Sequence, residues 1–149
     1  MKKGKLVSCL AIAVVFMFSM MVLAFAQQKA PDEVTLKPAL WPTLTKAAVK
    51  FNHKKHAVDD KIACNQCHHI YKDGKTNTWK EGDQVEKCEK CHTEATVQGE
   101  VKLPPDQKKL NLKLAFHNNC TPCHKKLKAE KPDTKAPATC AGCHPGAKD

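Results

Sequence analysis

Arginine is absent from this 149-residue chain, in which all 25 basic residues are lysine. Arginine supplies the planar fork that reads bases in DNA, and aromatic residues, at 5%, are too few for a platform on which bases could stack. The formal net charge of +10 therefore does not predict nucleic-acid binding. Methionine is also restricted, because all four methionines lie within the first 21 residues. The rest of the chain has no thioether side chain to offer as a ligand.

The only long apolar run lies at the N-terminus. Three lysines precede an almost wholly apolar stretch over residues 6–21, and residues 24–26 (Ala-Phe-Ala) form a small-x-small cleavage site. This pattern predicts a signal peptide over residues 1–26, cleaved after Ala26, and hence a periplasmic protein. An uncleaved membrane anchor is the alternative. Cys9 lies in this leader and is not expected to be a ligand; after cleavage we expect no stable membrane insertion.

Eight of the nine cysteines belong to four copies of the pattern Cys-x-x-Cys-His. This pattern is the attachment signature of a c-type haem: the two thiols add across the haem vinyl groups, and the histidine is placed to ligate the iron. The sequence therefore predicts four covalent haems as cofactors. The attachment cysteines are Cys64 and Cys67, Cys88 and Cys91, Cys120 and Cys123, and Cys140 and Cys143.

Two alternatives compete for the same cysteines. Paired Cys-x-x-Cys units are also half-sites of zinc ribbons, and eight cysteines could instead form four disulfides. Neither alternative needs a histidine directly after the second cysteine, yet a histidine is there in all four copies. Thiolate zinc sites also fit poorly with export to an oxidising compartment.

The histidine count indicates how the irons would be ligated. Four of the eight histidines lie inside the motifs, and four lie outside them. One outside histidine for each haem would make every iron six-coordinate, which leaves no open position for a small-molecule substrate. We therefore expect an electron carrier rather than an enzyme. The motif histidines are His68, His92, His124 and His144, and the others are His53, His56, His69 and His117.

The length of the chain limits its fold class. Removing the 26 leader residues from 149 leaves 123, or about 31 residues for each of four haems. So short a chain cannot enclose four porphyrins and also form a separate apolar core. We expect a small multihaem cytochrome of loops and short helices with a minor N-terminal β element, wrapped around a four-haem core and unable to fold without haem. The expected divisions are an extended arm over 27–48 and a tetrahaem domain over 49–149.

Three local patterns predict how this domain is organised. Alternating residues 48–51 predict a short strand that leads to His53 and His56. Residues 71–83 are rich in turn-forming residues and predict a surface loop. Residues 106–118 follow two prolines and predict a helix, on which Leu110, Leu114 and His117 would share one face.

The order of these ligands resembles that of the tetrahaem cytochromes c3 of sulfate-reducing bacteria. It runs His-x-x-His at His53 and His56, then the first motif extended by His69, then the second motif, then His117 and the last two motifs. The resemblance covers about residues 49–145. The uniform spacing of two residues between the cysteines is similar to the second type of cytochrome c3, whose members tend to be acidic, whereas the C-terminal end of this chain is basic.

The resemblance also implies which histidine serves which haem. Haem 1 would be bound by His68 and His53, and haem 2 by His92 and His69. Haem 3 would be bound by His124 and His56, and haem 4 by His144 and His117.

As a function, the resemblance implies a low-potential electron carrier of anaerobic respiration. Its redox partners would be a periplasmic dehydrogenase such as hydrogenase and a membrane-bound cytochrome complex. A small multihaem reductase of metal ions or nitrogen oxides is the alternative. Lysines flanking the last two motifs would form a docking face for an acidic partner: Lys125, Lys126, Lys128, Lys131 and Lys135.

Overall fold

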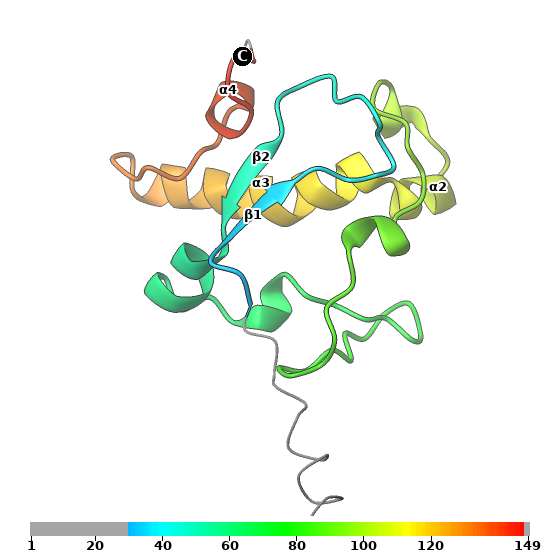
Figure 1. The fold of residues 1–149 in the computed structure, drawn as a ribbon, viewed down its shortest axis with the longest axis horizontal. Coiled ribbons are helices and arrows are strands. Elements are labelled where there is room, and N and C mark those ends of the chain that lie inside the picture. Colours follow the sequence, from blue (N-terminus) through cyan, green and yellow to red (C-terminus); the bar gives the residue numbers. More distant parts are fainter. Residues whose placement is uncertain (1–29, 148–149) are drawn as a thin grey trace, which may run out of the picture. The chain divides into compact units, whose positions relative to one another are not determined.

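The computed structural model describes residues 30–147, and from Pro31 onward they belong to one compact unit. The predicted signal peptide and Cys9 lie outside the described residues. Loops and short helical turns make up most of the described chain, together with one long helix and a small sheet (Figure 1). This architecture confirms the predicted fold class. Across residues 30–147, no helix is both long and apolar enough to cross a membrane.

A two-stranded antiparallel sheet begins the compact unit. Strand β1 (Glu33–Leu36) pairs with β2 (Val49–Asn52), with Glu33 opposite Asn52. Exposure alternates along both strands, as expected when every second side chain points to one face. The strand predicted over residues 48–51 is therefore present. Its partner β1 lies in the segment for which only an extended arm was predicted.

A single turn of π-helix, η1 (Lys55–Asp59), follows β2 almost directly. Three short 3-10 helices follow along the chain: η2 (Cys64–Gln66), η3 (Cys88–Lys90) and η4 (Glu100–Lys102). Between η2 and η3, an isolated antiparallel bridge joins Tyr71 to Asn77 and closes the loop that the sequence predicted. The sheet and these turns thus position the first histidines and cysteines.

The helix predicted over residues 106–118 is interrupted, and this prediction was wrong in its bounds. Helix α2 (Pro105–Leu110) ends before Asn111, whose ψ of 119° is extended, and α3 (Leu112–Glu130) then runs through the third motif. Leu110 and His117 therefore lie on different helices, and Leu110 is exposed. The last helix, α4 (Cys140–Cys143), is a single turn.

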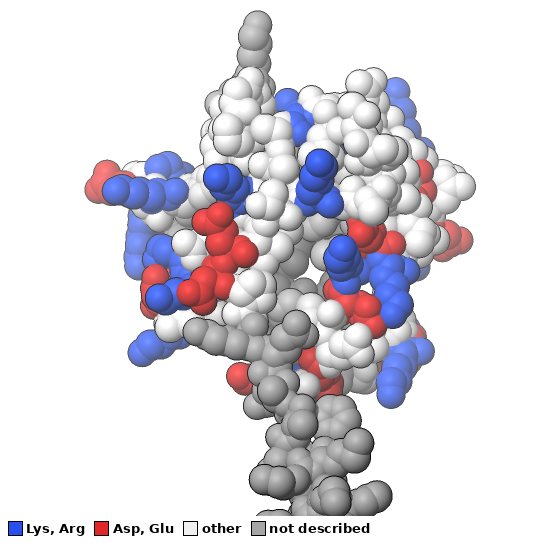
Figure 2. All heavy atoms as spheres, in the orientation of Figure 1, with Lys and Arg blue, Asp and Glu red and all other residues white. Residues whose placement is uncertain are grey.

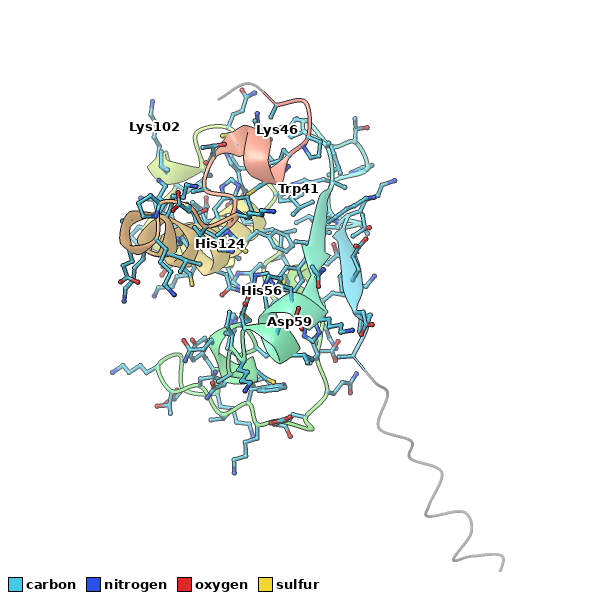
Figure 3. The ribbon with its side chains drawn as sticks, turned by 90° about the vertical axis from the view of Figure 1, so that its left-hand side faces the viewer. Trp41, Lys46, His56, Asp59, Lys102 and His124 are labelled. Atoms are coloured by element: carbon cyan, nitrogen blue, oxygen red, sulfur yellow. The ribbon has the colours of Figure 1, made fainter. Side chains whose placement is uncertain are left out.

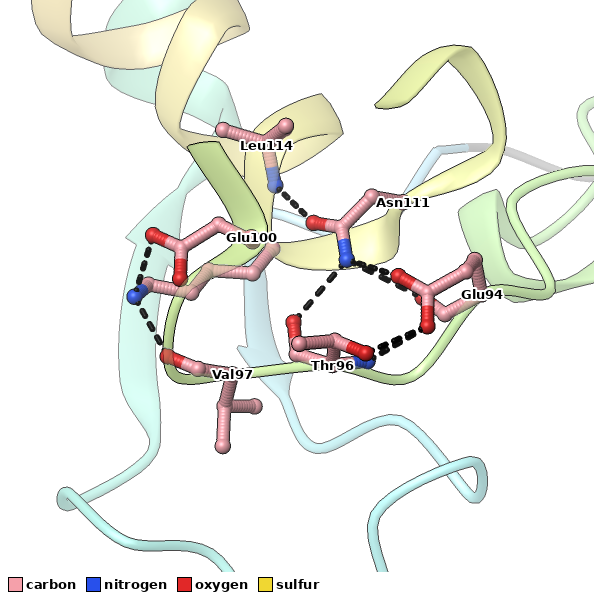
Figure 4. Close-up of polar contacts among 7 residues, drawn as sticks. Glu94, Thr96, Val97, Glu100, Asn111 and Leu114 are labelled. Atoms are coloured by element: carbon pink, nitrogen blue, oxygen red, sulfur yellow. Dashed lines mark hydrogen bonds and ion pairs between the residues drawn. The ribbon is translucent and has the colours of Figure 1, made fainter. Parts of the chain in front are cut away.

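Asn111 causes this interruption by acting as the N-cap of α3. Its side-chain oxygen accepts a hydrogen bond from the Leu114 amide at 2.8 Å, and its side-chain nitrogen donates to the Glu94 carboxylate and, at 2.9 Å, to the Thr96 carbonyl (Figure 4). An asparagine at an N-cap satisfies amides that have no partner within the helix.

A second set of contacts lies nearby. Lys113 of α3 donates to the Val97 carbonyl and pairs with Glu100, both at 2.6 Å. The connector over residues 94–100 is thereby fastened to α3.

The described polypeptide buries very few of its own side chains. Among residues 30–147, the apolar side chains that are buried are Trp79, at 8% exposure, and Leu112, at 0%. The sequence predicted that the apolar core would be this small, because a chain of this length was expected to pack around cofactors and not around its own side chains.

Candidate haem-binding site

Each of the four motifs is folded into one helical turn. In three of them, the amide of the motif histidine donates to the carbonyl of the first cysteine, at 2.9 Å for His68, 2.9 Å for His92 and 2.8 Å for His144. The third motif lies within α3 and is helical throughout. In the third motif, Cys120, Cys123 and His124 stand at i, i+3 and i+4 of an α-helix and therefore share one face. That geometry suits two thioether bonds and one iron ligand on a single haem.

The structure brings the eight histidines together in four pairs, each of one motif histidine and one outside histidine. The ring centres are 6.4 Å apart in the pair His53 and His68, 6.1 Å in His69 and His92, 5.9 Å in His56 and His124, and 6.4 Å in His117 and His144. These are the four pairs that the resemblance implied.

This spacing fits two imidazoles on opposite sides of one metal ion. A metal–imidazole bond is about 2 Å long and the ring centre lies about 1 Å beyond the nitrogen, so two opposed rings have centres about 6 Å apart. Direct contact between two stacked rings would bring the centres closer, within the lower part of the range of about 4.5–7 Å for aromatic pairs. The donor set also fits, because neutral imidazole is a common ligand of haem iron.

Four of the histidines also have their Nδ1 atoms fixed by backbone carbonyls. His92 is hydrogen-bonded to Lys109 O at 3.0 Å and His124 to Pro137 O at 2.7 Å; His144 is bonded to Ala47 O at 2.7 Å and His56 to Asn52 O at 2.8 Å. A metal-binding histidine commonly donates its second ring N–H to such a carbonyl, which fixes the tautomer and leaves Nε2 free to ligate. The arrangement therefore prepares these rings to bind through Nε2.

Burial favours the neutral form of several site residues, both histidines and cysteines. It lowers the pKa of His68 and of His92, which keeps the imidazoles in the neutral form that binds metal. In His92, the hydrogen bond to Lys109 O opposes part of this effect. Burial raises the pKa of the Cys67, Cys120 and Cys143 thiols, which reduces their thiolate content and hence their reactivity in disulfide exchange.

His53 and His56 are three residues apart but reach partners on different elements. His53 faces His68, next to η2, whereas His56 faces His124 on α3. Figure 3 shows His56 and His124 between the sheet side of the unit and α3. The short segment after β2 thus connects two of the four histidine pairs.

Three aromatic side chains that the sequence analysis did not single out lie against paired histidines. Phe51 contacts His56 with ring centres 4.7 Å apart and His53 at 6.0 Å, so it lies beside both pairs. Tyr71 stacks on His69 at 5.0 Å, and Trp79 lies 5.1 Å from His68. Phe51 and Tyr71 are each two residues from a histidine, which was a usable signal. Nothing local to Trp79 in the sequence pointed to His68.

The eight cysteines in the described chain are free of disulfides. Within residues 30–147, no three or more histidine, cysteine or acidic side chains converge as a bare metal ion would need. The histidines meet in pairs instead, and each pair is next to one cysteine motif.

Comparison with known proteins gives a consistent result. Residues 25–144 match the model of the class III cytochrome c family. The chain is 36% identical over 125 residues to a cytochrome c3 of Maridesulfovibrio salexigens, covering 80% of this chain and 98% of that protein. It is 31% identical over 123 residues to a cytochrome c3 of Desulfovibrio desulfuricans, covering 78% and 96% of the two chains. A 26 kDa cytochrome c3 of Desulfomicrobium norvegicum is 30% identical over 118 residues, covering 76% and 94%.

Proposed function

Because this chain belongs to the class III cytochrome c family, we propose that it carries four c-type haems and shuttles electrons at low potential between periplasmic and membrane redox proteins. The coarser statement follows from the family itself: the chain is a multihaem electron carrier that binds c-type haem. The number of haems, their ligands, the cellular location and the partners are the parts that we add.

The observation that carries the proposal is the pairing of all eight histidines at ring-centre distances between 5.9 and 6.4 Å. Haem 1 is assigned to Cys64, Cys67, His68 and His53. Haem 2 is assigned to Cys88, Cys91, His92 and His69. Haem 3 is assigned to Cys120, Cys123, His124 and His56, and haem 4 to Cys140, Cys143, His144 and His117.

The bound haems supply reversible one-electron chemistry at iron, and the chain supplies their ligands and fixed positions. If each histidine pair ligates one iron, no position at that iron is left for a small molecule. This supports a carrier over a reductase of metal ions or nitrogen oxides, which would need one iron with an open position. His53 and His56 share one short segment, and His68 and His69 are adjacent, so these four side chains would hold neighbouring haems close to one another.

Low potential follows from the ligand type. Replacing one of two histidines by methionine raises the reduction potential of a haem, and no methionine is present after residue 21. So short a chain would also leave four haems partly open to water, which would stabilise the ferric charge.

The location and partners rest on the leader pattern and on surface charge. A signal peptide over residues 1–26 would deliver the chain to the periplasm, where haem is attached to the thiols. A dehydrogenase such as hydrogenase would be the electron donor and a membrane-bound cytochrome complex the acceptor. Docking would use the basic end: Lys125, Lys126, Lys128, Lys131 and Lys135, all of which are exposed on α3 and the loop after it.

The mass of the exported protein tests the cofactor content. Under denaturing conditions, it should exceed the mass of residues 27–149 by four haem masses, and a pyridine haemochrome assay should give four haems per chain. A mass equal to the polypeptide with zinc, or a haem count other than four, would contradict the proposal.

The spin state tests the axial ligands. We expect all four haems to be low-spin in both oxidation states, and the native reduced protein to bind carbon monoxide slowly or not at all, because two imidazoles block each iron. A high-spin absorption band or rapid carbon monoxide binding would show that at least one histidine pair does not ligate, and would favour the reductase.

A further inference from the structure

The break between α2 and α3 leaves the Lys109 and Leu110 carbonyls free to accept hydrogen bonds from outside the helix. In an unbroken helix, each carbonyl accepts from the amide four residues later, so the Lys109 carbonyl would be paired with the Lys113 amide. Here the Leu110 carbonyl accepts from the Glu94 amide at 3.0 Å, and the Lys109 carbonyl accepts from the His92 ring, also at 3.0 Å. The break in the helix therefore turns two carbonyls toward the second motif and the residues after it.

Asn111 produces this break through its side chain. Its ψ of 119° is extended, and its Oδ1 accepts at 2.8 Å from the Leu114 amide, which in an unbroken helix would donate to the Leu110 carbonyl. Asn111 is fully buried, and its Nδ2 donates to the Glu94 carboxylate and, at 2.9 Å, to the Thr96 carbonyl. These bonds hold the capping side chain in place. The cap thus keeps the carbonyls at the end of α2 out of the helical hydrogen-bond pattern.

The hydrogen bond to His92 acts on a proposed ligand of haem 2. A carbonyl can only accept, so the ring proton lies on Nδ1 of His92 and the Nε2 lone pair is left for iron. An acceptor at the Nδ1 proton also makes the imidazole a more basic ligand. A more basic ligand favours the higher charge of ferric iron, and hydrogen bonding to an axial ligand is one of the means by which a protein adjusts the potential of a haem.

We propose that Asn111, by ending α2, presents the Lys109 carbonyl to His92 and thereby lowers the reduction potential of haem 2. This inference rests on the proposed function, because it requires that His92 ligates the iron of that haem. Asn111 is a positioning residue in this role, since it acts on the iron indirectly, through the carbonyl and the ring. A residue that only stabilised the fold would not change the potential of one haem in a protein with its full haem content.

Asn111→Ala is the test variant, because alanine favours a continuous helix, in which the Lys109 carbonyl would be paired with the Lys113 amide. Asn111→Ser separates the cap from the other bonds of this side chain: serine keeps an oxygen that can cap the helix, but it lacks the amide group of asparagine. Gln107→Ala, at an exposed and uncharged position of α2, is the matched control.

Individual potentials are measured by NMR-monitored redox titration, after a haemochrome assay has shown four haems per chain in each protein. We expect Asn111→Ala to shift the one-electron equilibrium of haem 2 about threefold toward ferrous iron, or about 28 mV given about 59 mV for a tenfold change. The shift is modest because the bond lies at an exposed position, where water can replace the carbonyl in the variant. Asn111→Ser and Gln107→Ala should shift haem 2 by less than half as much, and the other three haems should change less in every variant.

The absence of a shift at haem 2, an equal shift in Asn111→Ala and Asn111→Ser, or a larger shift at another haem would overturn the inference and leave the proposed function intact. A haem count other than four in the wild-type holoprotein would contradict the proposed function itself. A crystal structure of the wild-type holoprotein gives a second test, which does not depend on the folding of any variant. His92 Nδ1 should lie within about 2.7–3.2 Å of the Lys109 carbonyl oxygen. A continuous helix through Asn111, or any other acceptor at that nitrogen, would overturn the inference.

Discussion

At the scale of single residues, the site depends on two histidines that are close in sequence and serve different partners. His53 and His56 follow the same strand, yet their rings face His68 and His124 respectively. The two histidines are only three residues apart, so the backbone after β2 must direct their side chains to different sides. Phe51, which contacts both rings, fills the space between them.

Substituting these two histidines separately tests the assignment of ligands. In His53→Met, the haem attached at Cys64 and Cys67 should gain a thioether ligand and its potential should rise by more than about 59 mV, a tenfold change in the one-electron equilibrium. In His56→Met, the same rise should occur at the haem attached at Cys120 and Cys123. Potentials assigned to individual haems by NMR would check this. Both substitutions acting on the same haem would show that the pairing is wrong.

At the scale of elements, Asn111 determines where α2 ends and α3 begins. It is fully buried and bonds to both the Leu114 amide and the Glu94 carboxylate. At the same junction, the Glu94 amide donates a hydrogen bond to the Leu110 carbonyl at 3.0 Å. The His92 ring is hydrogen-bonded to the Lys109 carbonyl, also at 3.0 Å. The second motif is therefore anchored to the start of the long helix that carries the third motif.

Asn111→Ala should destabilise the holoprotein by about 1–3 kcal/mol, since it removes a helix N-cap and leaves buried groups at this junction without partners. Denaturant unfolding followed by circular dichroism would measure the loss. Asn118→Ala, on an exposed position of α3, is the matched control and should change stability by no more than about 0.5 kcal/mol. Equal stability of the two variants would mean that the cap does not hold the junction together.

At the scale of the whole molecule, the charges decide how the carrier would meet its partners. Figure 2 shows lysines and acidic residues interspersed over one face, with no uniformly basic field there. The lysines at the end of α3 are exposed, but some are already engaged: Lys126 lies 3.9 Å from Glu130, and Lys128 donates to the Thr134 carbonyl at 2.9 Å. Ion pairs this exposed contribute little to stability, so these lysines remain available for an acidic surface.

Reversing charge at Lys125 and Lys126 should slow electron transfer to an acidic partner by about tenfold at low salt, because steering by charge raises association rates by 10-fold or more. The same reversal at Lys72 and Lys75, exposed in the loop closed by the Tyr71–Asn77 bridge, is the matched control and should have a smaller effect. Stopped-flow rates over increasing salt should fall steeply, since the screening length is roughly 8–10 Å at ordinary ionic strength. Equal effects at the two sites, or rates independent of salt, would mean that docking occurs elsewhere.

The sequence by itself determined the parts of this protein that are local in the chain. The attachment motifs are five residues long, so their chemistry and their one-turn geometry can be read without knowing the fold. The fold class followed from the number of cofactors and the length of the chain. The strand at Val49–Asn52 also followed from a local alternation of polar and apolar residues.

Only the tertiary structure decided which groups distant in sequence meet. The residues alone did not say which outside histidine faces which motif; the pairing came from a resemblance, and the structure brings the same rings to about 6 Å. The helix break at Asn111 escaped prediction because the capping side chain of Asn111 is also held by Glu94, which lies 17 residues away. Trp79 escaped it for the same reason: its place beside His68 depends on Asn77, whose side chain is hydrogen-bonded to the Asn65 and His68 carbonyls and to the Ile70 and Trp79 amides. Hydrogen bonds and ring contacts of this kind depend on distance in space, which a pattern in the chain does not encode.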